Sequence, residues 1–330
     1  MTVSRALRNQ PRISESMRKQ IHEKALELGY RPDPMLSALA HYRQGRGAPP
    51  VNAAIAWLNR WPDPAQLRAY QEFDLYWEGA RKAAQKLGFH LEEFVVTEQM
   101  NPQRLATILL TRNVRGILLP PGPFAEGWAE TFPWEKFSVV SLGRNVSALP
   151  VHIVTSDQSA NTMLAFGALR QKGYERIGFV GRNWQPRLFG AGFLWAQMGI
   201  SEELRVPPLL FRSEDYATSE QAFISWFNAN KPDAILTEIS TLPQMLANSA
   251  CQKTEEVGLA AMSIVDCPID AGIFQNSEEI GRVSVLMLNS LINDNAKGIP
   301  PISREVLIKG RWVDGKSLPR RLAGDRRVAL

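Results

Sequence analysis

Beyond residue 50, short apolar runs alternate with amphipathic stretches along the chain. The apolar runs include AAIAWL, EEFVV, GILLP, SVVSL, RIGFVG, PDAILT, VGLAAM and AGIF. Between the first two runs, Phe73, Trp77, Ala80, Ala84 and Leu87 recur on one face of a helix. Short apolar runs separated by helical patterns predict βαβ units and parallel sheets that are covered on both faces. The body of the protein is therefore expected to be α/β.

The length of this body favours two lobes over one sheet. About 260 residues with around ten candidate strands could form a single sheet, but two lobes with a cleft between them fit the usual domain size better. Two helix starts have capping chemistry, namely Thr218 with Gln221 and Asn276 with Glu279. Ligands in such folds bind beyond the carboxyl ends of the strands. The residues that follow each apolar run are therefore the candidate binding residues.

The first 50 residues have a different pattern. Residues 2–9 are compatible with a helix, and Ser14 is a good N-cap for a second helix that ends at Gly29. The apolar residues of this second helix recur at helical spacing: Met17, Ile21, Ala25 and Leu28. Residues 35–43 could form one more short helix, and QGRGAPP has the composition of a linker. We therefore place a boundary near Pro50.

Composition places the chain among ordinary globular proteins. It has 330 residues, of which 45% are hydrophobic and 22% charged. No uninterrupted apolar stretch has the length of a membrane span, and the polar N-terminus lacks the apolar core of a secretion signal, so we expect a cytoplasmic protein with no membrane partner. Cys251 and Cys267 are too few for a disulfide framework, and we expect two reduced, half-buried thiols.

Positive charge is concentrated at the two ends of the chain. Residues 1–50 contain nine basic and four acidic side chains, and residues 304–330 contain eight basic and three acidic ones. The net charge of the whole chain is +5. The segment between the two ends is therefore acidic overall. A basic arm next to an acidic body suggests an appendage that binds a polyanion, although a solvated terminus would have the same composition.

The sequence has no recognisable signature of catalysis. GAGFLW lacks the third glycine of a dinucleotide fingerprint, and no P-loop, HExxH or GxSxG motif is present. The four histidines have no metal-ligand spacing. We therefore expect neither an enzyme nor a metal or other cofactor.

The first forty-odd residues resemble the LacI/GalR family of bacterial repressors. TVSRAL, then IS, then LGYRP and finally LSALA carry the resemblance. It implies that residues 2–9 are the recognition helix of a helix-turn-helix, followed by the third helix and by a hinge helix that enters the minor groove. The DNA-binding residues that it implies are Thr2, Ser4, Arg5, Arg8, Ser14, Tyr30 and Leu39.

Physical chemistry agrees with these assignments. The Arg5 guanidinium can donate two hydrogen bonds to guanine, and Thr2 and Ser4 are short donors suited to phosphates. Arg8 stands where the family usually has asparagine, which suggests a phosphate contact. Leu39 matches the leucine that the family inserts between base pairs, although it could instead pack against the body.

The resemblance continues more loosely through the body. Asp157 stands in the place of a characteristic aspartate, Arg187 where the family's arginine commonly meets an effector, and Gln275 in the place of a cleft glutamine. Trp61 follows the first strand and offers a flat face on which a sugar ring could stack. These four residues are the candidate effector site. Their alternative roles are helix cap, surface arginine, buried amide and core tryptophan.

Two segments depart from the family pattern. Ile239 and Ser240 stand where the family usually has a polar pair that binds ligand, and the segment around Asp266 is shorter than usual and lacks an acidic cluster. The identity of the effector therefore cannot be carried over. The family's first helix is also missing from the sequence, so the chain as written is expected to bind DNA weakly. Of the two explanations, a gene start upstream of Met1 is favoured over a true truncation.

These observations predict a two-lobed body like that of periplasmic binding proteins, with parallel sheets flanked by helices, preceded by a partial all-α helix-turn-helix and a hinge. The expected parts are a helix-turn-helix without its first helix (1–30), a hinge helix and linker (31–50), an N-terminal lobe (51–171 and 277–303), a C-terminal lobe (172–276 and 304–315) and a disordered basic tail (316–330).

The leading hypothesis for function is a ligand-responsive transcriptional regulator. It would bind a near-palindromic operator in double-stranded DNA as a homodimer, with a small-molecule effector such as a sugar or a derivative. The alternative is a cytoplasmic protein that binds a small, sugar-like molecule and has no role on DNA. A nucleotide-dependent α/β enzyme ranks third because the sequence lacks a phosphate loop.

Overall fold

A computed structural model describes residues 53–97, 99–144, 149–182, 189–212, 215–248 and 257–321, together with residues 14, 17, 19–21, 23 and 24. The chain divides into two units, residues 1–52 and residues 53–330. In the first unit, the described residues from Met17 to Lys24 are helical. The Ser14 hydroxyl accepts a hydrogen bond from the Met17 N–H at 3.4 Å, which is the geometry of an N-cap. The expected start of this helix is therefore confirmed.

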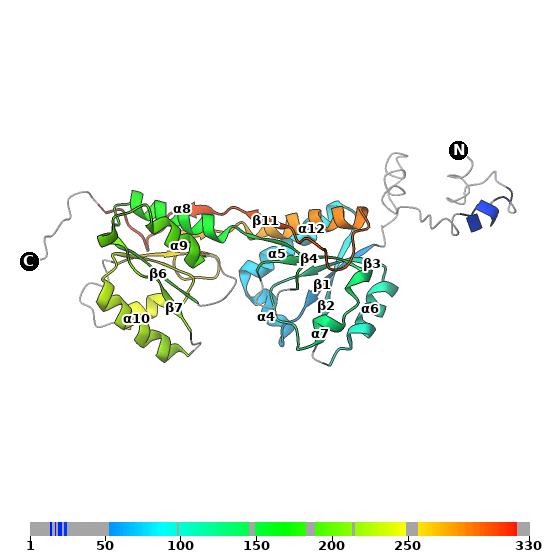
Figure 1. The fold of residues 1–330 in the computed structure, drawn as a ribbon, viewed down its shortest axis with the longest axis horizontal. Coiled ribbons are helices and arrows are strands. Elements are labelled where there is room, and N and C mark those ends of the chain that lie inside the picture. Colours follow the sequence, from blue (N-terminus) through cyan, green and yellow to red (C-terminus); the bar gives the residue numbers. More distant parts are fainter. Residues whose placement is uncertain are drawn as a thin grey trace, which may run out of the picture. The chain divides into compact units, whose positions relative to one another are not determined.

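The second unit contains two sheets of six strands each (Figure 1). The first sheet has the order β11-β5-β4-β3-β1-β2, and all of its strands are parallel. Its strands are β1 (Ala54–Asn59), β2 (His90–Val95), β3 (Val114–Leu119), β4 (Ser138–Leu142), β5 (His152–Ser156) and β11 (Glu305–Ile308). β1 is buried along its whole length because helices cover both faces of the sheet.

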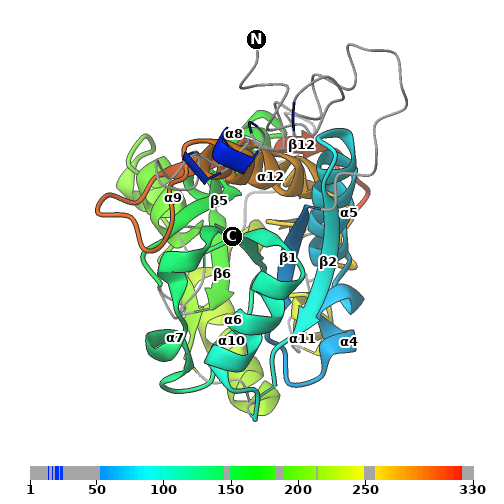
Figure 2. The same ribbon diagram turned by 90° about the vertical axis from the view of Figure 1, so that its right-hand side faces the viewer.

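Helices cover the first sheet on both sides. One side is packed by α5 (Gln71–Lys86) and α12 (Ser277–Asn293), which lie next to each other (Figure 2). The other side is packed by α6 (Pro102–Thr111) and α7 (Trp128–Thr131) with the aromatic residues of their core cluster. The short helix α4 (Pro64–Ala69) precedes α5, and a 3-10 turn, η1 (Trp134–Lys136), precedes β4.

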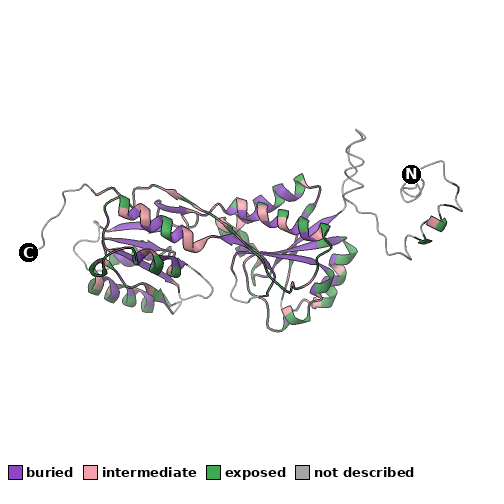
Figure 3. Ribbon diagram, turned by 45° about the horizontal axis from the view of Figure 1, so that its top comes forward, coloured by how far each residue is buried: buried purple, intermediate pink, exposed green. Residues whose placement is uncertain are grey.

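The second sheet has the order β12-β10-β9-β8-β6-β7, and only β12 is antiparallel to its neighbour. Its strands are β6 (Ile177–Arg182), β7 (Leu209–Phe211), β8 (Ala234–Thr237), β9 (Gly258–Ala261), β10 (Gly272–Phe274) and β12 (Arg311–Val313). α8 (Gln158–Gln171) and α9 (Phe189–Gln197) pack on one face. α10 (Tyr216–Asn230) and α11 (Leu242–Asn248) pack on the other, and a 3-10 turn, η2 (Glu202–Leu204), precedes β7. Figure 3 shows the two buried sheets inside their exposed helices.

The predicted α/β fold with two lobes is thus confirmed, and the predicted apolar runs match β1, β2, β3, β4, β6, β8, β9 and β10. The hydropathy pattern did not predict β5, β7, β11 and β12. β7 and β12 have three residues each, which is too short for a clear alternating pattern. The cap of α10 was also misplaced, because Asp215 rather than Thr218 accepts the N–H bond that begins the helix.

The chain crosses between the sheets three times, and the lobes divide differently from the expected ranges. Residues 158–171 form α8, which packs on the second sheet and not on the first. β11 pairs with β5 in the first sheet, so part of the range 304–315 lies outside the C-terminal lobe. Hydropathy indicates which residues of a segment are apolar, but it does not say which sheet the segment joins.

The expected disorder of the basic tail is wrong for residues 316–321. Leu318 is fully buried in the core of the C-terminal lobe, and the Tyr174 hydroxyl donates to the Pro319 carbonyl at 2.8 Å. The Asp270 carboxylate also accepts the N–H groups of Lys316 and Ser317. A single buried leucine with these bonds is enough to order the segment. Residues 322–330 lie outside the described residues.

Two glycines allow α5 and α12 to cross with their backbones in contact. A Cβ atom on Gly281 would overlap the carbonyl oxygen of Tyr76, and one on Gly79 would overlap the carbonyl oxygen of Glu278. In both cases the obstacle is backbone, which cannot move out of the way like a flexible side chain. The crossing therefore requires glycine at both positions.

Gly281→Ala should lower the free energy of unfolding by about 3 kcal/mol or more, because the added methyl group forces the two helices apart. Gly167→Ala is the matched control, since Gly167 is also helical and a Cβ there would meet no atom within 4 Å. This control should be neutral or stabilising by up to about 1 kcal/mol. Urea unfolding of both variants tests the crossing, and equal effects would contradict it.

His152 makes the fold sensitive to acid. It is buried on β5, and its Nδ1 atom accepts the N–H of Arg304 at 3.0 Å. Burial and the nearby charge of Arg304 lower the pKa of His152 below its ordinary value. The unfolded chain then binds a proton more readily than the folded chain as the pH falls below about 6.5, so stability is full above that pH and is lost on acidification.

Between pH 7.5 and pH 5.5, the free energy of unfolding of the wild-type protein should fall by at most about 1.4 kcal/mol for each pH unit, the limit for one titrating group. His152→Gln should flatten this dependence, since an amide oxygen can accept the same bond without titrating. Denaturant unfolding at several pH values gives the slopes, and an unchanged slope in His152→Gln would refute the assignment.

Candidate functional site

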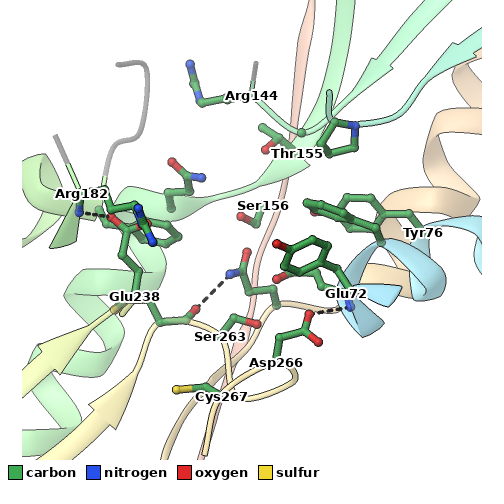
Figure 4. A pocket seen from close by; sticks show the side chains of 18 of the residues that line it. Glu72, Tyr76, Arg144, Thr155, Ser156, Arg182, Glu238, Ser263, Asp266 and Cys267 are labelled. Carbon is green, nitrogen blue, oxygen red and sulfur yellow. Dashed lines mark hydrogen bonds between the residues drawn. The ribbon is translucent and has the colours of Figure 1, made fainter. Parts of the chain in front are cut away.

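A cavity of about 550 Å³ lies between the two lobes of the second unit. Residues that line it follow β1, β3, β4, β6, β8, β9 and β10, so the cavity is formed by the carboxyl ends of strands from both sheets (Figure 4). This volume is typical of sites for small molecules. No described helix has the length and apolar character needed to cross a membrane.

Aromatic side chains form the wall that the N-terminal lobe contributes. Trp61 follows β1, Tyr70 immediately precedes α5, and Phe73 and Tyr76 lie on its first two turns. The ring centroids of Trp61 and Tyr70 are 5.5 Å apart, those of Tyr70 and Phe73 are 5.6 Å apart, and those of Phe73 and Tyr76 are 5.7 Å apart. We call these four residues the aromatic wall. Such a wall presents flat apolar faces to whatever enters the cavity.

The segment 120–124 completes this wall and is held by two neighbouring residues. The Trp61 indole N–H donates to the Pro121 carbonyl at 2.7 Å, and the Arg60 guanidinium donates to the Pro120 carbonyl. The Arg60 guanidinium carbon also lies 4.1 Å from the centroid of the Phe124 ring. Residues 121–123 line the cavity. The position of this part of the cavity therefore depends on Arg60 and Trp61.

Arg60 is a buried cation. It is only 6% exposed, and burial lowers the pKa of its guanidinium to about 9. No carboxylate among the described residues forms an ion pair with it, and its Nε atom has no hydrogen-bond partner there. Removing an unpaired charge from water costs more free energy than one carbonyl bond and a ring contact recover. Stability alone therefore does not account for an arginine at this position.

Polar side chains form the opposite wall, from the C-terminal lobe. Glu238, directly after β8, accepts the backbone N–H of Arg182 at 2.9 Å, and Gln275, after β10, donates to the Met262 carbonyl at 3.0 Å. The Ser263 hydroxyl lines the cavity but is shielded from bulk water and has no hydrogen-bond partner in the described protein. We call Glu238, Ser263 and Gln275 the polar wall. The Gln275 amide is held in place by its hydrogen bond, and the Ser263 hydroxyl has no partner among the described residues, so both suit a ligand with hydroxyl groups.

The polar side of the cavity also contains Cys267 and Asp266. Burial raises the pKa of the half-buried Cys267 thiol, so this thiol stays protonated and poorly nucleophilic at neutral pH. The Asp266 carboxylate accepts two backbone N–H groups at the start of α5, which belongs to the other lobe. Cys251 lies outside the described residues.

The structure brings together two of the four residues predicted for an effector site. Trp61 and Gln275 line the cavity on opposite walls. Asp157 is not among the lining residues, and its carboxylate caps α8 by accepting the Ala160 N–H at 3.1 Å, although its neighbours Ser156 and Gln158 do line the cavity. Arg187 lies outside the described residues, as do the predicted DNA-binding residues Thr2, Ser4, Arg5, Arg8, Tyr30 and Leu39.

Sequence reasoning missed several residues of the site. Glu238 directly follows β8 and was not predicted. The departure from the family pattern pointed instead to Ile239, which is buried in the core, and to Ser240, which does line the cavity. The rule that ligands bind after strand ends would have found Glu238 and Ser263 if it had been applied to every strand. Phe73 and Tyr76 carry no such signal, because they lie on a helix and look like ordinary core residues, and Tyr70 lies at the break between α4 and α5.

The comparisons with known proteins agree with this geometry. Residues 1–33 match the model of the bacterial regulatory proteins of the lacI family. No curated protein matches the chain. Several solved structures of regulators are similar to most of the chain. Their sequence identities are between 14% and 18%, so the similarity is evidence about the fold alone.

Three of these structures cover the chain well. The transcriptional regulator CelR in complex with cellobiose has a TM-score of 0.58 and 17% identity, over 95% of this chain and 94% of that chain. The lac repressor dimer bound to operator and the anti-inducer ONPF has a TM-score of 0.57 and 18% identity, over 96% and 94%. The LacI family regulator CCPA from Weissella paramesenteroides with bound sucrose has a TM-score of 0.57 and 14% identity, over 82% and 100%.

The fold and the cavity between the lobes define a two-lobed α/β protein of the periplasmic-binding-protein type, and the solved structures named above share this fold. Residues 1–33 match the model of the bacterial regulatory proteins of the lacI family, in agreement with the resemblance seen in the sequence.

Arg60→Met should leave the free energy of unfolding unchanged or raise it by about 1 kcal/mol or more, because an apolar side chain of similar size replaces an unpaired buried charge. The same change should loosen the segment 120–124 and shift the NMR signal of the Trp61 indole N–H. Arg311→Met is the control, since Arg311 stacks on Phe274 at 4.6 Å but is exposed. A large loss of stability in Arg60→Met would show that its contacts outweigh the cost of burial.

Proposed function

We propose that this protein is a transcriptional regulator whose affinity for DNA responds to a small molecule bound between its two lobes. The proposal rests on the presence of two features in one chain. Residues 1–33 match the lacI-family model, and the body contains a cavity with an aromatic wall and a polar wall. In this proposal the protein acts in the cytoplasm as a homodimer on a near-palindromic operator, because one reading head spans only half a site. The cavity carries out no reaction.

The two walls of the cavity support a ligand that is apolar on one face and polar at its edges. A sugar or a sugar derivative has this character, since the C–H face of its ring stacks on aromatic side chains and its hydroxyl groups form hydrogen bonds. The similar regulators whose structures contain cellobiose or sucrose support the same class of ligand. The proposed contacts are Trp61 for stacking and Gln275 for hydrogen bonds, with Asp157 and Arg187 carried over from the family resemblance.

On the DNA side, Arg5 is proposed to contact a base, and Thr2, Ser4, Arg8 and Ser14 are proposed to contact phosphates. Tyr30 and Leu39 would contact the operator near the hinge, where Leu39 would act as a wedge. Ser14 also caps its own helix, a role compatible with a phosphate contact because a hydroxyl can accept one bond while it donates another.

The proposed mechanism couples the lobes to the DNA-binding segment. A ligand that contacts both walls stabilises one arrangement of the lobes over others and therefore shifts the equilibrium between arrangements. By linkage, operator DNA must then change the affinity for the ligand by the same factor as the ligand changes the affinity for DNA.

A screen of mono- and disaccharides by thermal shift, followed by calorimetry on the full chain, tests the ligand site. Ser263→Ala should weaken the binding of a sugar found in this way by about 2- to 10-fold, the effect of about one hydrogen bond, and should not lower the free energy of unfolding. Ser284→Ala is the control, because this buried hydroxyl donates to the Ile280 carbonyl at 2.8 Å away from the cavity. Normal sugar binding by Ser263→Ala would remove this residue from the site.

Operator selection from random DNA tests the second half of the proposal. Binding should depend on sequence, fall steeply with salt and change when the sugar is added, and Arg5→Ala should weaken it. Sugar binding that persists without any sequence-specific DNA binding would instead favour a small-molecule binding protein with no role on DNA.

A further inference from the structure

Asp266 joins the two lobes across the cavity. It lies between β9 and β10 in the C-terminal lobe, and its two carboxylate oxygens each accept a backbone N–H from the N-terminal lobe. Oδ1 accepts the N–H of Gln71 at 2.9 Å, and Oδ2 accepts the N–H of Glu72 at 2.9 Å. Figure 4 shows Asp266 next to the start of α5, with one of these bonds drawn. The residues in contact are 194 and 195 positions apart in the sequence.

This carboxylate replaces a cap that α5 lacks in its own sequence. Four other helices of the body are capped by the side chain that precedes them, namely Asp63 for α4, Asn101 for α6, Asp157 for α8 and Asp215 for α10. The residue before α5 is Tyr70, whose side chain makes no capping bond. The N–H groups at a helix start need acceptors, and the helix dipole favours a negative charge there. For α5, both requirements are met by the opposite lobe.

The contact also involves the wall of the cavity. Asp266, Tyr70, Glu72 and Phe73 all line the cavity, and the capped turn of α5 carries Phe73 of the aromatic wall. Separating the lobes would break both hydrogen bonds and detach this turn from the polar side of the cavity. The arrangement that keeps the two walls together therefore includes the cap.

We propose that Asp266 is an interlobe clasp, a positioning residue that holds the first turn of α5 against the C-terminal lobe and so sets how readily the cavity opens. This inference rests on the proposed function for its regulatory meaning, because opening and closing matter to DNA binding only if the cavity takes a ligand. The clasp acts by stabilising the arrangement in which both walls face each other. Its loss should weaken ligand binding even though the carboxylate is already bound to the protein.

A second assignment makes a different prediction. Asp266 lines the cavity, so its carboxylate could instead contact the ligand directly. In that case, its removal would weaken ligand binding without changing the distance between the lobes in the ligand-free protein. The two assignments are separated by a measurement of that distance.

Asp270 offers a matched control in the same loop. Its carboxylate also accepts two consecutive backbone N–H groups, those of Lys316 and Ser317, each at 2.8 Å, and these bonds lower its pKa to about 2. Both partners belong to the C-terminal lobe. Asp270 therefore has the chemistry of Asp266 without the connection between lobes.

The experiment measures the distance between spin labels at Thr107 on α6 and Gln221 on α10, both exposed, in the full chain with Cys251 and Cys267 replaced by serine. Asp266→Ala should raise the fraction of molecules with separated lobes by about tenfold, which corresponds to about 1.4 kcal/mol, within the range for the loss of a helix cap. Asp266→Asn keeps one acceptor and should lie between. Asp270→Asn should leave the distances as in the wild type.

Unchanged distances in Asp266→Ala, with a folded protein by circular dichroism, would overturn the clasp. A change of equal size in Asp270→Asn would also overturn it, because the effect would then be general destabilisation. These distances are measured without ligand, so a failure to find any sugar or operator would count against the proposed function and leave the result on the clasp standing. Unchanged distances combined with weaker sugar binding in Asp266→Ala would assign Asp266 to direct ligand contact.

Discussion

The crossing of α5 and α12 fixes the position of a helix that forms part of the cavity wall. Gly79 and Gly281 bring the two backbones into contact, and α12 packs on β3, β4 and β5 of the first sheet. This contact holds α5 at a defined place over the sheet, and the first turns of α5 carry Phe73 and Tyr76 of the aromatic wall. Backbone atoms in contact cannot move apart by a change of side-chain rotamer, so the crossing is rigid. The residues of the aromatic wall that lie on α5 are therefore held in a fixed position.

The cavity contains groups that a purely structural core would not keep. Arg60 carries a buried charge with no carboxylate partner among the described residues, and the Ser263 hydroxyl has no partner there either. Each of these groups lowers stability relative to an apolar replacement. Both lie at the cavity or directly behind its wall, while the layers on the outer faces of the sheets are ordinary apolar clusters. A buried polar group without a partner beside a cavity is a candidate contact for a ligand.

Some helices of the body are capped by a neighbouring residue, and α5 is capped by a residue far away in the sequence. Helices α4, α6, α8 and α10 begin at a side chain that precedes them, so their starts are encoded in a few consecutive residues. The start of α5 depends on Asp266, which is nearly two hundred residues away. A helix whose cap is supplied by another lobe is coupled to that lobe. A movement of the lobes relative to each other removes the cap and changes the stability of the helix start.

The sequence by itself determined the class of the fold, most of its strands and the family of its first residues. Apolar runs between helical patterns are set by which residues must be buried, and the motif at the N-terminus is contiguous in the chain. Trp61 could be chosen because it follows a strand, and Gln275 because it stands in the place of a glutamine that the family resemblance implies. Only the tertiary structure decided which sheet takes α8 and β11, that Leu318 is a core residue, and that Tyr70, Phe73, Tyr76 and Asp266 meet at one cavity. These features depend on contacts between residues far apart in the chain, and hydropathy records that a residue is buried but not against what.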